Sequence, residues 1–159
     1  MSTYYAVIDT NTLVSAMLKM HSIPGRVVQL CLNGMIVPLY NEIIKEEYSK
    51  VLHRKKFNFE EEDICDLLSN LLGKGIQVSC DPQNWNLPDA SDAVFFEVVM
   101  EHRKTEEHSY LVTGNLRHFP GRAFVVTPYE MLQIIANDLL LEHFLYHTWN
   151  HTSNHRRKP

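Results

Sequence analysis

Short apolar runs alternate with amphipathic helical stretches along this chain, and this alternation limits the folds that it can adopt. Apolar runs typical of strands occupy residues 4–8, 35–39, 76–80, 109–113 and 123–126. Apolar residues at helical spacing predict helices over 10–20, 26–32, 42–53, 60–72, 89–102 and about 128–141. Strands that alternate with helices usually form a parallel sheet, because each helix carries the chain back to the same edge. We therefore predict an α/β fold with a mostly parallel central sheet.

The length of 159 residues fits one domain with a full hydrophobic core. We predict this domain over residues 1–145, followed by a polar tail over 146–159 that is frayed or disordered. The three cysteines are odd in number and form no Cys-x-x-Cys pair, which argues against a disulfide scaffold and a cysteine zinc site. Free thiols fit the reducing cytoplasm.

Hydropathy and charge narrow the class of protein further. No apolar run approaches the roughly 18 residues that span a bilayer, and the N-terminus lacks the pattern of a signal peptide. We expect a cytoplasmic protein that does not bind membranes. The net charge of −4 argues against a broadly basic nucleic-acid binder. A nuclease stays compatible with it, because an acidic centre needs only local positive groups around it.

Polar residues follow two of the predicted strands. Asp9 comes directly after the first strand, while Thr113 and Asn115 come at the end of the fourth. Ligands bind outside the carboxyl ends of the strands in an open parallel sheet, so we expect these side chains at one functional edge. Simpler interpretations exist for each: Asp9 caps the helix that follows it, and Thr113 to Asn115 forms a turn.

Glu47 lies on the apolar stripe of its predicted helix, because it is four residues after Ile43, three after Ile44 and four before Val51. Its neighbour Glu46 points elsewhere. A carboxylate on a core-facing stripe costs several kcal/mol unless a partner or a metal compensates its charge. Glu47 is therefore either a metal ligand or an edge-of-core acid paired with Arg or Lys.

Asp92 repeats this pattern at the start of its own helix. It is three residues before Phe95 and four before Phe96, which places it on the buried side. Asp89 is the natural N-cap there, and the two acids together are also consistent with simple capping. Three acids on the inner faces of one small domain are nevertheless expected to come together or to find partners. An oxygen-rich cluster favours Mg²⁺ or Mn²⁺ over zinc, and such ions activate water and neutralise phosphodiester charge.

Four segments in order resemble the PIN-domain family of metal-dependent ribonucleases. They are VIDTNTLVSA at 7–16, EYSKVL at 47–52, PDASDAVFFEV at 88–98 and YLVTGNLRHFP at 110–120. More narrowly, the chain looks like bacterial PIN-family toxins of toxin–antitoxin systems. The resemblance covers about residues 4–135. It implies a three-layer α/β/α fold, an RNA substrate and an antitoxin protein as partner, and it is compatible with a homo-oligomer.

By position, the resemblance implies that Asp9, Glu47 and Asp92 bind Mg²⁺ or Mn²⁺. It implies a polar shell that positions these acids or the attacking water, formed by Thr10, Asn11, Thr113 and Asn115. Many family members carry Asp where Asn115 stands, so the number of metal ions is open. Asp89 and Glu97 are candidates for a fourth acid.

Two residues of the last matching segment have two interpretations. Arg117 and His118 either hold a substrate phosphate or lie in a solvent-facing turn, and we favour the turn.

Two other functions are alternatives to the ribonuclease. A haloacid-dehalogenase-type phosphohydrolase would use Asp9 as a nucleophile, but it needs a second Asp at position 11, where Asn11 stands. A PIN-like binding module without activity is the other alternative, suggested by the neutral side chain of Asn115.

The C-terminal region carries two patterns outside this constellation. Histidines recur every four residues, at His143, His147, His151 and His155, and would line one face of a helix and chelate Zn²⁺. We expect a disordered polar tail there instead. We also expect core residues at Leu132, Ile134, Ile135, Leu139 and Leu141. The residues left over form either a surface for a dimer or an antitoxin, or packing against the domain itself: Leu140, Phe144, Leu145, Tyr146 and Trp149.

Overall fold

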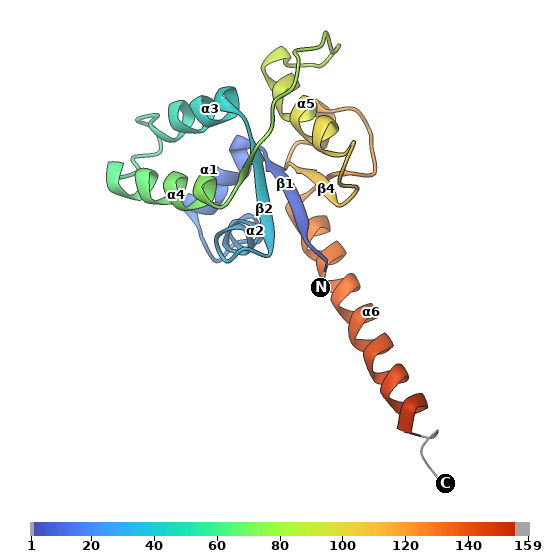
Figure 1. Ribbon diagram of the computed structural model, residues 1–159. Coiled ribbons are helices and arrows are strands. Elements are labelled where there is room, and N and C mark those ends of the chain that lie inside the picture. Colours follow the sequence, from blue (N-terminus) through green and yellow to red (C-terminus); the bar gives the residue numbers. More distant parts are fainter. Residues whose placement is uncertain (1, 155–159) are drawn as a thin grey trace.

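The computed structural model describes residues 2–154, with side chains described as far as residue 148. Over this range, five strands form one parallel sheet in the order β3-β2-β1-β4-β5 (Figure 1). The strands are β1 (Tyr4–Ile8), β2 (Ile36–Tyr40), β3 (Ile76–Gln77), β4 (Ser109–Val112) and β5 (Val125–Val126). The predicted α/β fold with a parallel sheet is confirmed.

Six α-helices connect and cover the strands over the described residues. They are α1 (Thr10–Leu18), α2 (Ile23–Leu32), α3 (Glu42–Leu52), α4 (Glu61–Gly73), α5 (Ala93–His102) and α6 (Pro128–Asn154). Two 3-10 turns, η1 (Ala90–Asp92) and η2 (Leu116–His118), precede α5 and follow β4. Helix α5 packs across β1, β2 and β4, whereas α2 packs on β2 and against α1 and α6. Parallel crossovers are right-handed, so α5, which runs back across the sheet, covers the face opposite α1 to α4.

The helix starts follow from local chemistry. The Ser22 side chain accepts a hydrogen bond from the Gly25 amide, and Asn41 accepts one from the Ile44 amide. These contacts satisfy amide groups that have no partner within the first turn of a helix. Gly25 has a second role, because a Cβ built there would lie 2.0 Å from the carbonyl oxygen of Met20. The start of α2 therefore packs directly against the preceding turn.

The central strand β1 shows why the sheet is covered on both faces. Its consecutive residues Ala6, Val7 and Ile8 are all buried, although successive side chains of a strand point to opposite faces. Continuous burial of this kind is characteristic of a parallel strand between two layers of helices. The strand thus has no solvent-facing side, and the next residue that can reach a ligand comes after its end.

The chain order of the strands creates a switch point beside β1. The chain passes from β1 to β2 and β3 on one side, then crosses to β4 and β5 on the other. In the register of β1 and β4, Ile8 pairs with Val112. Asp9 and Thr113 are the next residues of the two strands, so they lie side by side at the edge where ligands bind in this class of fold.

Several sequence predictions were wrong in detail. Strand β3 spans two residues rather than 76–80, because it lies at the edge of the sheet, where both of its residues are exposed. Ile43 is exposed rather than part of the α3 core stripe. Helix α6 continues past residue 141 to Asn154, and Leu139 and Leu141 are exposed because this part of the helix leaves the domain. Within residues 2–154, no helix is long and apolar enough to cross a membrane.

The predicted division at residue 145 therefore falls inside a helix, and it stays a prediction. The side chains of Trp149 and His151, and all of His155, lie outside the described residues. The rings of His143 and His147, which are described, contact each other with centroids 4.3 Å apart.

Candidate metal centre

Asp9 holds the central position of the site. It occupies the N-cap position of α1, but its side chain makes no capping hydrogen bond. Instead its Oδ2 accepts a hydrogen bond of 2.7 Å from the hydroxyl of Thr113, and both residues are buried. The same hydroxyl oxygen accepts the amide of Asn115 at 2.9 Å. The contact between the ends of β1 and β4 therefore replaces the simple capping role.

Burial raises the pKa of the Asp9 carboxyl above its ordinary value, and this effect outweighs the Thr113 hydroxyl and the nearby amides of Thr10 and Asn11, which lower it. The backbone before Asp9 is fixed, because the buried Tyr48 hydroxyl donates a hydrogen bond to the carbonyl oxygen of Ile8. Tyr48 adjoins Glu47 in α3, so this hydrogen bond ties α3 to the end of β1. A carboxylate held in this way is costly to ionise and gains from a nearby cation.

Asp92 stands at the junction of η1 and α5, with its side chain 16% exposed. Burial raises its pKa, and the negative charge of Asp9 raises it further. The imidazole of His118 lies against Asp92, with Nδ1 3.1 Å from Oδ2, and lowers this pKa. Asp92 itself makes no capping hydrogen bond. The charge of Asp9 thus acts on Asp92, although the two residues come from distant parts of the chain.

Glu47 is half-buried on α3, a helix that packs against α1 and α5. No Lys or Arg of the described residues forms an ion pair with it, which removes the simpler interpretation of a paired edge-of-core acid. However, no three His, Cys, Asp or Glu side chains within that same range converge closely enough to hold a metal ion. The charge of Asp9 therefore reaches Asp92, but Asp9, Asp92 and Glu47 do not form a closed cluster of three acids.

The donor set fits a hard divalent ion. Mg²⁺ is commonly held by one or two carboxylates together with water and substrate oxygens, and Asp9 and Asp92 can supply these carboxylates. Next to Asp9, the buried hydroxyl of Thr10 has no hydrogen-bond partner among the described residues. It is a further oxygen that needs a polar partner at this position. Asn11 is exposed to solvent, and Asn115 is half-buried.

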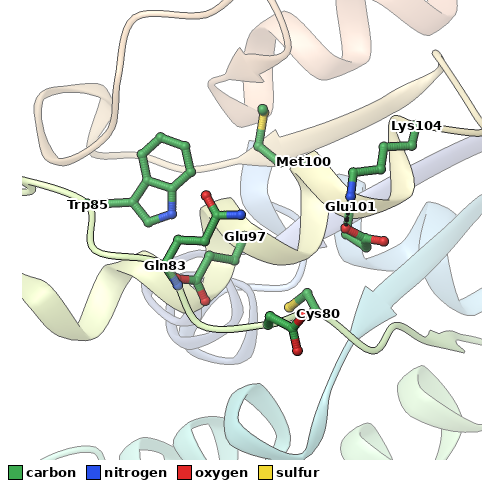
Figure 2. Close-up of a pocket in the computed structure, with 8 residues that line it drawn as sticks. Cys80, Gln83, Trp85, Glu97, Met100, Glu101 and Lys104 are labelled. Carbon is green, nitrogen blue, oxygen red and sulfur yellow. Dashed lines mark hydrogen bonds and ion pairs between the residues drawn. The ribbon is translucent and has the colours of Figure 1, made fainter.

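The two candidates for a fourth acid behave differently. Asp89 caps η1, because its Oδ1 accepts both the amide and the hydroxyl of Ser91, and this contact lowers its pKa. Glu97 accepts the amide of Gln83 at 2.8 Å. It also lines a cavity of about 220 Å³ along α5 that includes Trp85 and none of the three proposed metal ligands (Figure 2). Glu97 therefore belongs to a separate feature of the molecule.

The contact of His118 with Asp92 was not anticipated from the sequence. Arg117 is exposed, as expected for a solvent-facing turn, but His118 is half-buried against the acid. The only sequence signal was the position of His118 five residues after Thr113, at the edge where strand β4 ends. Such spacing alone does not tell which way a side chain turns.

The fold places this protein among the open parallel α/β proteins, which bind their ligands at the switch point where Asp9 lies. A family model described as PIN domain matches residues 5–117, more than half of the chain. The chain therefore belongs to the PIN domain family, whose members are typically nucleases that use divalent metal ions. Asp9, Glu47, Asp92 and Asn115 all lie within the match. A comparison with curated proteins found no match.

Proposed function

We propose that this chain is a Mg²⁺- or Mn²⁺-dependent endoribonuclease that hydrolyses RNA phosphodiester bonds. One observation carries the proposal: the carboxylate of Asp9 is buried at the switch point in a hydrogen bond with Thr113, and its charge raises the pKa of Asp92. Two acids that repel each other form a site for a hard cation. Family membership supports nuclease chemistry at this edge.

Asp9 and Asp92, with Glu47 from α3, are the residues that we assign to the ion. When bound, such an ion supplies Lewis-acid activation of water and neutralises charge on a phosphodiester. Thr113 holds the Asp9 carboxylate in one orientation through its 2.7 Å hydrogen bond. Asn115 offers a neutral amide where an acid would add charge. His118 orients Asp92, and the exposed Arg117 is available to a substrate phosphate.

The four segments quoted above support a second part of the proposal, that the chain is the toxin of a toxin–antitoxin pair in the cytoplasm. Expression of the chain should then arrest growth, and co-expression of its antitoxin should relieve the arrest. The Asp9→Ala variant should express without arrest. If Asp9→Ala arrests growth as strongly as the wild-type chain, the toxin role does not depend on this site and the proposal is wrong.

Cleavage of a labelled RNA tests the nuclease assignment directly. Wild-type protein should cleave with Mg²⁺ or Mn²⁺ and stop on addition of a chelator, and Asp9→Asn or Asp92→Asn should lose roughly a hundredfold or more of the rate. Glu47→Gln should also lose activity, whereas its neighbour Glu46→Gln, exposed on the same helix, should not. Metal-dependent cleavage that survives both aspartate changes would overturn the assignment.

The neutral Asn115 keeps one alternative open, a PIN domain that binds RNA without cleaving it. That function predicts metal-dependent RNA binding with no cleavage of any substrate tested. Binding that is lost in Asp9→Asn, without turnover by the wild-type chain, would favour this alternative over the nuclease. A phosphohydrolase with a covalent intermediate on Asp9 would instead show a trappable phosphoryl-aspartate. Asn11, which is exposed, stands where that mechanism needs its second acid.

A further inference from the structure

The cavity of about 220 Å³ along α5 is separate from the proposed metal ligands, and we call it the α5 cavity. One wall is a single face of α5 and the turn after it, because its residues are three or four positions apart: Glu97, Met100, Glu101 and Lys104. The second wall is the segment between β3 and η1, which contributes Asp81 and Trp85 among others. The proposed nuclease site uses none of these side chains.

The volume of the α5 cavity limits the kind of ligand that it can hold. Pockets for drug-sized ligands and cofactors usually measure roughly 300–1,000 Å³. At about 220 Å³, the α5 cavity is too small for a nucleotide and suits a single side chain or a molecule of that size. A metal ion does not fit the observations, because no three His, Cys, Asp or Glu side chains converge to hold one within the part of the chain that the structure describes.

The charges of the α5 cavity do not cancel. Its lining contains three carboxylates and one ammonium group. The Nζ atom of Lys104 lies 2.6 Å from Oε2 of Glu101, so these two neutralise each other. Asp81 and Glu97 form no ion pair with any side chain among the described residues. Glu97 accepts only the amide of Gln83. Two negative charges therefore remain without a cation.

The thiol of Cys80, which also lines the α5 cavity, reports the resulting negative field. Burial raises the pKa of this thiol, and the charges of Glu97, Glu101 and Asp81 raise it further. Lys104 therefore does not reverse the sign of the field. Phosphate groups of RNA would be repelled here, because they need positive side chains. The cavity favours an organic cation instead.

The uncharged groups of the α5 cavity narrow the choice of cation. The buried Nε1 atom of Trp85 has no hydrogen-bond partner among the described residues, although buried donors nearly always have one. Figure 2 shows this nitrogen on the side of the ring that faces Gln83 and Glu97. Met100 adds an apolar wall that a chain of methylene groups can cover. A ligand that combines a cation, an aliphatic stem and a carbonyl oxygen would match all of these groups, and a basic residue in a peptide has this combination.

We propose that the α5 cavity binds the side chain of an arginine residue of a partner polypeptide, with its guanidinium group on Glu97 and near the charge of Asp81. Arginine suits the site better than lysine, because its planar fork of N–H donors can bind a carboxylate through two parallel hydrogen bonds. A guanidinium group is also less strongly hydrated than an ammonium group, so it enters a half-buried site at a lower cost. A peptide carbonyl oxygen would supply the acceptor that Trp85 lacks.

Tryptophan fluorescence of the full chain tests the proposal. The chain has two tryptophans, so Trp149→Phe leaves Trp85 as the only reporter. Titration with N-acetyl-arginine methylamide at constant ionic strength should change the Trp85 emission, with a dissociation constant on the order of 1 mM. The corresponding citrulline compound has nearly the same shape but a neutral urea group. It should bind at least about tenfold more weakly, because the charged contact is lost.

Glu97→Gln tests the carboxylate without removing the acceptor of the Gln83 amide. It should weaken binding of the arginine compound at least about tenfold. Glu130→Gln is the matched control, because Glu130 is also a half-buried acid that accepts a backbone amide, that of Thr127, and it lies outside the α5 cavity. It should leave binding unchanged. Equal melting temperatures by circular dichroism would show that both variants fold.

Four results would overturn the proposal. They are no binding of the arginine compound, equally tight binding of the citrulline compound, tighter binding of the lysine compound, and a Glu97→Gln variant that binds like the wild type. Agmatine, a guanidinium compound without peptide groups, separates the two sources of the cation. If agmatine binds more tightly than the arginine compound, the natural ligand is a free small cation and the polypeptide partner is wrong. None of these results depends on whether the chain cleaves RNA.

Discussion

The Nδ1 atom of His118 lies 3.1 Å from Oδ2 of Asp92, which links the turn after β4 to the start of α5. The contact opposes burial, which is the larger effect and raises the pKa of Asp92. It therefore keeps a half-buried acid ionised over a wider pH range than burial alone would allow. Because Asp92 is one of the proposed metal ligands, this histidine should control the pH at which the site is usable.

We predict that His118→Ala moves the acidic limb of the cleavage pH profile to higher pH. Without the imidazole, the pKa of Asp92 rises further. A larger fraction of Asp92 is then protonated at low pH and unable to bind a cation. His118→Ala should mainly shift the pH midpoint of this limb and have less effect on the rate at the plateau. His108→Ala is a suitable control, because the His108 side chain is 44% exposed against 41% for His118 and forms its ion pair with Glu107 rather than with Asp92. A limb that stays in place would show that His118 has no such role.

Asp9→Asn should stabilise the protein at neutral pH when a chelator is present. Burial raises the folded-state pKa of Asp9 above its ordinary value of 3.8. The stability that protonated Asp9 contributes is therefore fully present below pH 3.8 and is lost as pH rises through the folded-state pKa. At pH 7 the wild type bears the whole cost of a buried charge, which the neutral amide avoids.

Thermal unfolding of Asp9→Asn against wild type, from acidic to neutral pH, measures this effect. The difference in Tm should grow as pH rises and shrink as pH falls towards 3.8. Asp66→Asn, which changes an aspartate exposed on α4, should show no such trend. A difference in Tm that is constant across pH would mean that ionisation of Asp9 does not affect stability.

Thr113→Val should impair both the metal site and the fold. Valine has a similar shape but no hydroxyl, so the Asp9 carboxylate loses its 2.7 Å donor and the Asn115 amide loses its acceptor. Loss of a side chain that orients a metal ligand typically lowers metal affinity by about 10–100-fold. Unsatisfied buried groups should also cost about 1–3 kcal/mol. Titration with Mn²⁺ and chemical unfolding measure the two effects, and Thr113→Ser, which keeps the hydroxyl, should restore much of both.

Asn115→Asp should strengthen binding of the divalent ion. The residue follows Thr113 at the same edge of the sheet, and a carboxylate there would add a negative charge to a site that already holds two acids. The Mg²⁺ concentration for half-maximal cleavage should fall by roughly tenfold. Asn84→Asp, in the exposed loop before α5, adds the same charge away from the site and should leave it unchanged. No shift in Asn115→Asp would mean that this side chain does not reach the ion.

The arrangement of Asp9 and Thr113 was predictable because strand ends are local features that a parallel sheet brings to one edge. The buried strand before each residue is visible in the sequence, and the register of β1 and β4 then places them together. The position of Glu47 was harder to predict. Helical spacing shows on which face of a helix a residue lies, but not how close that face comes to a neighbouring element. Ile43, on the same predicted stripe, proved exposed for that reason.

The contact of His118 with Asp92 was not predictable, because it depends on how the turn after β4 and the turn before α5 approach each other. The length of α6 was missed for a different physical reason. Polar residues such as Asn150 and Thr152 have low helix propensity, which predicts an early end. Helix α6 nevertheless continues to Asn154. Propensity is a weak indicator of where a helix ends.

Gly25→Ala should destabilise the fold more than any comparable change at another helical glycine. A Cβ at this position would lie 2.0 Å from the carbonyl oxygen of Met20 and 2.8 Å from its Cα, so α2 or the preceding turn has to move. Such overpacking typically costs about 1–3 kcal/mol, even though alanine favours helix in general. Gly73→Ala near the end of α4 is the control, because nothing lies within 4 Å of a Cβ there. Chemical unfolding should show a loss for Gly25→Ala and no loss for Gly73→Ala, and equal effects at both sites would contradict the close packing of α2 on Met20.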